Sequence, residues 1–449
     1  MLGRIFATVC WLASGSAAFA QSGADTPFRD YDAGRYRAAS AGAEAALKTE
    51  SENPVWWALL GEAQARLDRN TEAAEAFGNA ARFEADAARR SYFLRAQALE
   101  LVYAGRHEEA RAIVRAAMDD PPVETRNSLD WAMVAISARD DASAQSILDN
   151  EALYPQFTRQ SALDAAYSAK RRGLDRRAAD FFQRALALDA GEGAPLSTVQ
   201  REGIRRENRE LTRDWSFIAQ GSYSSAGRPI GPAGTSLGDE RAAQFGAEVS
   251  RRIGGWRNGR PFSVFARVYH SEYLSADAVS GNAAQGWAGV RYKPLSQVNL
   301  NLEASRLIAL DDDGLDDWSL RAAISGGQGL EPEVGRQSWA YAHYYGDVSY
   351  LTDADVTFGL AEGRAGYSFL VGGSATVLTP YAVARLGVDT GRLKEEALGA
   401  GVGVSVRHWF GESDTTAYRG FVDFDVQARQ RIAGDRRASG VLAMLTIGR

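Results

Sequence analysis

Apolar and polar residues alternate in several runs of the C-terminal half of the chain. The stretch "GVSVRHWFGESDTTAYRGFVDFDVQARQRI", residues 403–432, contains two such runs joined by a polar turn. In the second run Val422 and Phe424 fall on one side, while Asp423 and Asp425 fall on the other. A period of two predicts β-strands, here with one apolar face and one charged face.

About twelve runs of this kind follow one another, separated by segments rich in turn residues. They lie near 216–226, 242–253, 262–273, 285–294, 297–309, 317–326, 338–350, 356–371, 376–390, 396–410, 418–432 and 437–448. Strands of about 9–11 residues cross a bilayer at a tilt, and membrane barrels usually have an even number of strands. The pattern predicts an antiparallel outer-membrane β-barrel of about 12 strands over residues 215–449.

A soluble β-sandwich would show the same alternation, with its apolar faces packed against each other in a core. In a membrane barrel the apolar faces contact lipid and the polar faces line the lumen. Candidate interfacial aromatic residues and the charge density of the polar faces favour the barrel. These aromatic residues are Trp215, Tyr292, Trp318, Tyr367, Trp409, Phe410 and Tyr418.

The charged face of the predicted barrel supplies the candidate pore-lining residues. They are Arg267, Arg291, Glu303, Arg321, Glu362, Arg364, Arg407, Asp423, Asp425 and Arg429. A twelve-strand barrel is narrow, between the filled eight-strand kind and the open sixteen-strand kind. Two arrangements stay open: a paired lattice that plugs the barrel, and a wet pore that passes a polar chain.

The connections between the runs differ in length in the way expected of an outer-membrane barrel. The expected outer ones are "GRPIGPAGTSLGDER", "SADAVSGNAA", "DDDGLDD" and "DTGRLKE", while "KPLSQ", "VGGSA" and "FGESDTTA" are expected inner turns. Longer loops outside and shorter turns inside are the usual asymmetry. The segment "GGQGLEPEVGRQ" is too long for an inner turn, which indicates a miscounted strand at that place.

The N-terminal half instead has apolar residues at helical spacing in an Ala-, Glu-, Arg- and Leu-rich composition, over residues 26–196. Small residues recur at Ala39, Ala73, Ala110, Ala144 and Ala178, which lie 34, 37, 34 and 34 residues apart. This period predicts an α-solenoid of tetratricopeptide-type (TPR-like) repeats, four of them plus a leading partial one. An ordinary Ala-rich helical bundle is the alternative. Residues 197–214 form the predicted linker to the barrel.

The unit "PVWWALLGEAQARLDRNTEAAEAFGNAARFEA" carries the clearest repeat pattern. Its packing positions are Trp57, Leu60, Gly61, Ala73, Phe77 and Ala80. Gln64 stands where that pattern usually has Tyr. Small residues at these positions allow two antiparallel helices to cross closely, and such repeats build binding surfaces. We therefore expect protein partners on the solenoid.

Residues 1–20, "MLGRIFATVCWLASGSAAFA", have a basic start, a short apolar run and an Ala-Phe-Ala end. This is the pattern of a secretory signal peptide. It predicts export, an outer-membrane barrel and a periplasmic N-terminal domain. The single cysteine, Cys10, lies within the signal, so the mature chain is predicted to hold no disulfide.

Motifs for chemistry are weak in this sequence. The four histidines are scattered, and "DDDGLDD" does not meet the ligand positions of a calcium loop. With a net charge of −6 and no basic stretch interleaved with aromatics, nucleic acid is not an expected partner. We expect no enzymatic activity, no catalytic residue, no metal and no cofactor.

Three stretches resemble the C-terminal domain of bacteriophage adsorption protein A (NfrA-type proteins). They are "VRYKPLSQVNLNLEASRLIAL" (290–310), "LTPYAVARLGVDTG" (378–391) and "GAGVGVSVRHWFGESDTTAYRGFVDFDVQARQRIAGDRRASGVLAMLTIG" (399–448). The likeness covers roughly 285–449. The repeat region is short for that family, and the end "LTIGR" lacks the terminal Phe or Trp common in outer-membrane barrels.

The resemblance implies a role in export or display of a surface polysaccharide, with a polysaccharide synthase complex as partner, and use as a phage receptor. The expected surroundings are outer-membrane lipid and the surface glycan. Two other readings stay open. One is a non-conducting surface receptor or adhesin, and the other is a periplasmic scaffold with a soluble β-domain.

Overall fold

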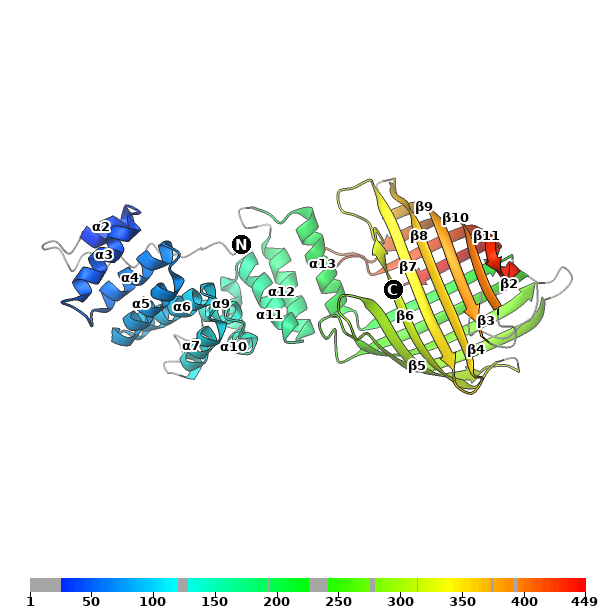
Figure 1. Ribbon diagram of the computed structural model, residues 1–449, viewed down its shortest axis with the longest axis horizontal. Coiled ribbons are helices and arrows are strands. Elements are labelled where there is room, and N and C mark those ends of the chain that lie inside the picture. The colour runs from blue at the N-terminus through cyan, green and yellow to red at the C-terminus, as the bar shows by residue number, and fades with distance from the viewer. Residues whose placement is uncertain are drawn as a thin grey trace. The chain divides into compact units, whose positions relative to one another are not determined.

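The computed structural model describes residues 26–119, 128–189, 191, 194–225, 241–274, 279–312, 314–372, 375–390 and 395–449. The predicted signal peptide lies outside these residues, as do parts of five predicted connections. The chain divides into two compact units, Met1–Arg172 and Gly173–Arg449 (Figure 1). No helix of the described chain is long and apolar enough to cross a membrane.

The first unit consists of successive helices that pack on their neighbours. They are α2 (Thr26–Asp32), α3 (Tyr36–Leu47), α4 (Pro54–Arg66), α5 (Asn70–Phe83), α6 (Ala87–Tyr103), α7 (His107–Asp119), α9 (Leu129–Ser137), α10 (Asp141–Ile147), the short 3₁₀ helix η2 (Glu151–Gln156) and α11 (Arg159–Arg171). The helical TPR-like architecture predicted for the N-terminal region is confirmed.

The repeat is visible in the backbone as well as in the side chains. After α2, α4, α6, α9 and α11 the chain turns through one left-handed residue: Gly34, Asp68, Gly105, Arg139 and Gly173, with φ between +59° and +77°. These residues are again 34, 37, 34 and 34 positions apart. The same turn therefore begins the second helix of each pair. Glycine adopts this conformation without a Cβ clash, whereas Asp68 and Arg139 adopt it at a cost.

The predicted packing residues of the first unit lie between its paired helices. The five recurring alanines are fully buried, and Phe77 and Ala80 lie in one core cluster with Trp57 packed on its edge. A Cβ added at Gly61 would come within 3.0 Å of the Phe77 ring. Helices α4 and α5 therefore approach closely only because position 61 is glycine.

The second unit begins with two helices, α12 (Asp175–Leu188) and α13 (Thr198–Thr212), and continues into twelve strands. The strands are β1 (Trp215–Ser224), β2 (Arg241–Ile253), β3 (Phe262–Leu274), β4 (Val279–Tyr292), β5 (Asn299–Ala309), β6 (Asp317–Gln328), β7 (Ser338–Leu351), β8 (Val356–Val371), β9 (Thr376–Asp389), β10 (Glu395–Phe410), β11 (Gly420–Gly434) and, after the 3₁₀ helix η3 (Arg436–Ala438), β12 (Gly440–Gly448). The segment predicted as a linker, 197–214, thus contains a four-turn helix.

The strands form one closed antiparallel barrel in which each strand pairs with its neighbours in sequence. Strands β1 and β12 close it, from Ile218 opposite Gly448 to Ser224 opposite Leu442. A single closed sheet has no second sheet to cover its outer face. The predicted barrel of 12 strands is therefore confirmed, and the two-layer sandwich is excluded.

The two faces of the sheet differ as the alternation predicts. Phe424 on β11 is 50 % exposed, whereas its neighbours Asp425 and Gln427 are fully buried. Phe424 lies opposite Val406 on β10 and Leu445 on β12, both of which are also exposed. Apolar side chains thus cover the outside of the barrel, and charged ones lie within it.

Two details of the sequence prediction are wrong. Segment 329–337 is a long connection between β6 and β7, not the sign of a miscounted strand. Trp409, predicted at the lipid interface, is buried in a cluster with Trp339 and Val377. The alternation places Trp409 on the inward face, beside Arg407, because both have odd numbers on one strand.

Candidate functional site

The barrel interior is the candidate functional site. All ten predicted pore-lining residues occupy inward positions of the strands, on the same face as Asp423 and Asp425. In the described strands, three ion pairs join strands that are not neighbours. Arg291 on β4 reaches Glu248 on β2, at 2.8 Å. Arg267 on β3 reaches Glu303 on β5, at 3.5 Å, and Arg364 on β8 reaches Asp425 on β11, at 2.9 Å. In each of these contacts the side chains reach past at least one intervening strand, across the interior of the barrel.

Inward charges on one side of the barrel form what we call the β2–β7 lattice. Its members are Glu248, Arg267, Arg291, Glu303, Arg321 and Asp347. Glu303 is its centre and accepts from Arg291 at 2.7 Å and Arg321 at 3.1 Å. Three arginines and three carboxylates make the lattice formally neutral. Burial of charge is tolerable only with such complete pairing.

The opposite side carries the β8–β11 lattice. Its members are Glu362, Arg364, Arg385, Arg407, Asp423, Asp425 and Arg429. Arg364 binds Glu362 at 2.6 Å and Asp425 at 2.9 Å, and Tyr381 donates to Asp425 at 2.6 Å. Among the described residues Arg429 forms no ion pair, and its Nε is buried without a hydrogen-bond partner. Four arginines face three carboxylates, so this lattice carries a surplus positive charge.

Apolar clusters close the interior on both sides of the lattices. Trp287, Leu307, Leu351 and Phe358 pack together toward the end of the barrel that bears the β5–β6 and β7–β8 loops. At the other end lies the cluster of Trp339, Val377 and Trp409 already described. A cavity of about 20 Å³ beside Arg407 and Trp409 has room for about one water. Along the described strands, paired charged side chains and these apolar clusters therefore occupy this part of the interior.

Helix α13 lies at the mouth of the barrel on the side of the β2–β3, β6–β7 and β10–β11 connections. Arg205 pairs with Glu412 at 2.8 Å, Arg209 pairs with Glu331 at 3.0 Å, and Arg252 of β2 donates to the Glu210 carbonyl at 2.6 Å. These three connections are four strands apart in the closed sheet. A helix that touches two of these connections, and β2 next to the third, crosses the mouth (Figure 1).

The contacts of α13 explain the long β6–β7 connection. Glu331 in this segment binds both Arg206, at 3.3 Å, and Arg209. Burial alone would lower the pKa of Arg209, but Glu331 and Glu210 hold that pKa above its usual value. On the barrel side of α13, Ile204, Asn208 and Leu211 are buried, and Asn208 donates to the Thr415 carbonyl at 2.8 Å. The helix is thus fastened over the mouth by charge and by packing.

Some members of the site escaped the sequence prediction. Glu248, Asp347 and Arg385 belong to the lattices and lie on the polar faces of β2, β7 and β9. Strict alternation along those strands would have found them. Helix α13 gave a helical signal with a capping Ser197, but nothing in its pattern says that its apolar stripe covers a barrel mouth. In the described part of the chain no three His, Cys, Asp or Glu residues gather as metal ligands.

The class of protein follows from this architecture. A closed twelve-strand barrel with an apolar exterior, a charged interior and a preceding helical-repeat unit fits an outer-membrane protein with a TPR-like scaffold. Residues 276–445 match the family described as Bacteriophage N adsorption protein A C-term. The resemblance noted over roughly 285–449 is therefore confirmed for the barrel segment. No curated protein matches the chain.

Several solved structures are similar to the helical part. A MamA protein from Desulfovibrio magneticus RS-1 is 14% identical, with 38% of this chain and 94% of that chain covered and a TM-score of 0.32. YrrB, described as a TPR protein with an unusual peptide-binding site, is 14% identical, covering 36% and 83%, with a TM-score of 0.30. PilW, described as a type IV pilus biogenesis factor, is 20% identical, covering 42% and 83%, with a TM-score of 0.32. Likenesses this weak support no conclusion about ligand or partner.

Proposed function

We propose that this chain is a non-enzymatic outer-membrane protein that takes part in display of a surface polysaccharide and serves as a phage receptor. In this proposal the barrel anchors the chain and presents its β1–β2, β3–β4, β5–β6, β7–β8, β9–β10 and β11–β12 loops at the cell surface. The helical repeats lie in the periplasm and bind a protein partner, such as a polysaccharide synthase complex. The observation that carries the display role is that the inward carboxylates are largely buried and paired with arginines.

The free-energy cost of breaking buried ion pairs distinguishes a display role from a transport role. A pore that passes a polar chain keeps its lining charges in contact with water, whereas here the lattice carboxylates are largely buried and paired with arginines. Breaking one such pair without replacing it costs about 3–5 kcal/mol. Because its interior charges are already paired, the closed barrel is stable without a bound glycan or a partner protein.

Planar bilayer recordings test the display proposal directly. We expect no stepwise conductance from the purified full-length protein, because the lattices and the two apolar clusters occupy the interior. A deletion strain under conditions where the linked synthase is active tests the glycan role, and loss or mislocation of surface polysaccharide is expected. Open-channel steps, or unchanged surface polysaccharide in the deletion strain, would contradict the respective part of the proposal.

Export through the barrel is the second candidate, and one feature of the interior, its use of charged rather than apolar side chains, is compatible with it. An apolar filling of the same volume would make an equally good permanent plug, since replacing buried ion pairs by packed apolar residues is often neutral or stabilising. Charged pairs can instead exchange partners with the hydroxyl groups of a passing glycan. Conductance that appears only when the partner complex is present would support export over simple display.

A further inference from the structure

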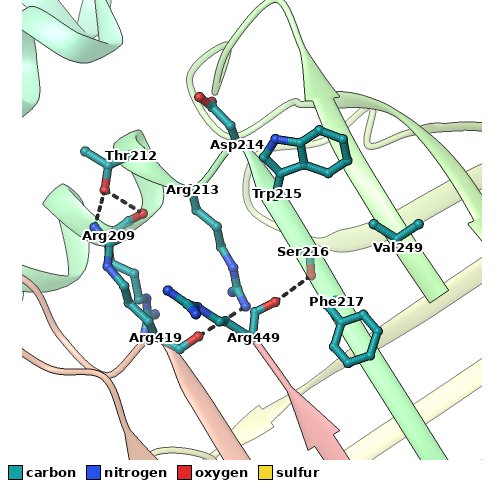
Figure 2. A pocket seen from close by; sticks show the side chains of 10 residues that line it. All are labelled: Arg209, Thr212, Arg213, Asp214, Trp215, Ser216, Phe217, Val249, Arg419 and Arg449. Carbon is teal, nitrogen blue, oxygen red and sulfur yellow. Dashed lines mark hydrogen bonds between the residues drawn. The ribbon is translucent and has the colours of Figure 1, made fainter. Parts of the chain in front are cut away.

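A cavity at the α13 end of the barrel lies outside the interior lattices. Its volume is about 460 Å³, and it opens where β1 meets β12 beneath the end of α13 (Figure 2). The lining residues are Arg209, Thr212, Arg213, Asp214, Trp215, Ser216, Phe217, Val249, Arg419 and Arg449. Four arginines and one carboxylate thus share one hollow.

The arginines of this cavity are short of acidic partners. Arg209 is engaged by Glu210 and Glu331, each at 3.0 Å. Arg419 donates to the Thr212 hydroxyl at 2.9 Å, and Arg213 reaches only the Arg419 carbonyl, at 3.5 Å. Within the described chain neither Arg213 nor Arg419 forms an ion pair. Burial lowers the pKa of Arg213, and the charges of Arg209 and Arg419 lower it further, while the charges of Glu210 and Glu331 raise it. An anion beside Arg213 and Arg419 would relieve the repulsion between the arginines.

Arginines near the end of a helix often serve only to offset its dipole. That account covers Arg209 and Arg213 at the end of α13. It does not cover Arg419, which precedes β11, or Arg449, which follows β12. The barrel itself therefore contributes positive charge to the same hollow.

The other wall of the cavity belongs to the apolar exterior of the barrel. Trp215, Phe217 and Val249 are 59%, 45% and 42% exposed, and Phe217 lies directly opposite Val249 in the β1–β2 ladder. Arg251 stacks on Trp215, with its Cζ 5.3 Å from the ring centroid. Figure 2 shows the arginines on one side of the hollow and these three side chains on the other. Tryptophan beside arginine at the end of an apolar band marks the level of the lipid headgroups.

We propose that this cavity binds one phospholipid with a net anionic headgroup. The phosphate lies between the guanidinium groups of Arg213 and Arg419, whose planar donors suit phosphate oxygens. The acyl chains run along Phe217 and Val249 on the outer surface of β1 and β2. The ligand has to suit both halves of the site. A free anion would make no use of the apolar wall, and a neutral lipid would leave the arginines unpaired.

Native mass spectrometry of the full-length protein released from bicelles of mixed phosphatidylglycerol and phosphatidylethanolamine tests this site. We expect one retained phosphatidylglycerol per chain, enriched at least about fivefold over its share in the bicelle. The R213Q/R419Q variant should lose this enrichment. The matched R260Q/R336Q variant removes two exposed arginines from turns at the same end of the barrel and should keep it.

Three outcomes would overturn the proposal: no enrichment in the wild-type protein, equal retention of both lipids, or equal enrichment in the two double variants. Displacement of the lipid by millimolar inorganic phosphate would identify a free-anion site and overturn the lipid assignment. If R213Q/R419Q does not fold, the ratio of the two lipids retained by the wild-type protein still tests the proposal. Failure here leaves the polysaccharide role untouched, because the deletion strain and bilayer recordings measure different properties.

Discussion

At the scale of single residues, the effect of a buried charge on the stability of the barrel depends on its ion-pair partners. Arg364 and Arg429 lie on the same inward face, since Arg364 is linked through Val383 and Gly401 to Arg429 in the strand register. Arg364 holds two carboxylates, while Arg429 holds none within the described chain. The same substitution should therefore have opposite consequences at the two positions.

We predict that Arg364→Gln lowers the free energy of unfolding of the barrel by about 3–5 kcal/mol, because Glu362 and Asp425 lose their shared cation. Arg429→Gln, the matched control, should change it by less than about 1 kcal/mol or stabilise the barrel, because it removes the surplus charge. Urea titration of protein refolded in lipid vesicles measures both. Equal losses would contradict the assignment of Arg429 as the surplus cation.

The left-handed turn residues give a second prediction. Arg139 has φ +59° at a position where three of the five repeats have glycine. Arg139→Gly should raise the stability of the repeat unit by about 0.5–1 kcal/mol, because the relief of Cβ strain exceeds the entropy cost of glycine. Arg172→Gly, at φ −79°, should be destabilising. Thermal unfolding followed by circular dichroism distinguishes them, and a loss of stability in Arg139→Gly would be contrary to this account.

A buried carboxyl in the repeat unit makes its stability depend on pH. Glu62 on α4 accepts from Tyr92 at 2.8 Å and from Tyr31 at 3.3 Å. Burial raises the pKa of Glu62 above its usual value of 4.5, and burial together with Glu62 raises the pKa of Tyr31 to about 12. The folded state thus holds the Glu62 proton more tightly than the unfolded state does. The stabilisation that the Glu62 proton gives to the repeat unit is fully present below about pH 4.5. It is lost as the pH rises through the raised pKa of Glu62.

We therefore expect Glu62→Gln to stabilise the repeat unit at pH 7 and to flatten the fall in stability above about pH 4.5. Gln keeps an oxygen that accepts from Tyr92 and needs no ionisation. The control is Glu44→Gln, at an exposed position of α3. Denaturant titrations between pH 4 and pH 8 measure the effect. If Glu62→Gln and the wild type show parallel pH profiles, the buried proton is not the cause.

At the scale of elements, the strands were predictable and α13 was not. Alternation located every strand because each has an apolar outer face and a more polar inner face, so a slip of one residue would reverse all of its side chains. The apolar stripe of α13, with Ile204 and Leu211, shows only that one side of the helix is covered. Asn208 on the same stripe bonds to Thr415, which is 207 residues away in sequence, and a local sequence pattern does not predict such a contact.

Trp409 shows that the type of a residue alone does not determine where it lies in the barrel. Tryptophan is common both at membrane interfaces and in cores, so residue type alone could not place it. The parity of the strand could, because Trp409 shares its face with Arg407. The candidate lattice residues were found for the complementary reason: ionised side chains on a strand that crosses lipid have to face inward.

The contacts of α13 predict that the helix covers the mouth but is not the plug. In the variant R205Q/N208A/R209Q the helix loses its ion pairs with Glu412 and Glu331 and its bond to Thr415. We expect faster protease cleavage near residue 205 but no conductance in planar bilayers, because the lattices remain. R206Q, which removes a single arginine with its ion pairs to Glu202 and Glu331, serves as the milder control. Stable conductance in the triple variant would show that α13 alone closes the barrel.

At the scale of the whole molecule, one chain combines a repeat unit suited to binding with a barrel suited to anchoring. The repeats bury alanine between helix pairs, which leaves the outer surfaces of the pairs available for a partner. The barrel buries charge inside and exposes Val402, Phe424 and Leu445 outside, which is unfavourable in water and favourable in lipid. The account of function therefore depends on which environment the outer face contacts.

Site-directed spin labelling tests that environment most directly, because the only cysteine, Cys10, lies in the predicted signal peptide. Labels at Val404→Cys and Phe424→Cys should collide readily with oxygen and poorly with a water-soluble nickel complex when the protein is in liposomes. Labels at Ser405→Cys and Gln427→Cys should be immobile and protected from both. High nickel accessibility at positions 404 and 424, with oxygen access at 405 and 427, would contradict a barrel whose apolar face lies in lipid.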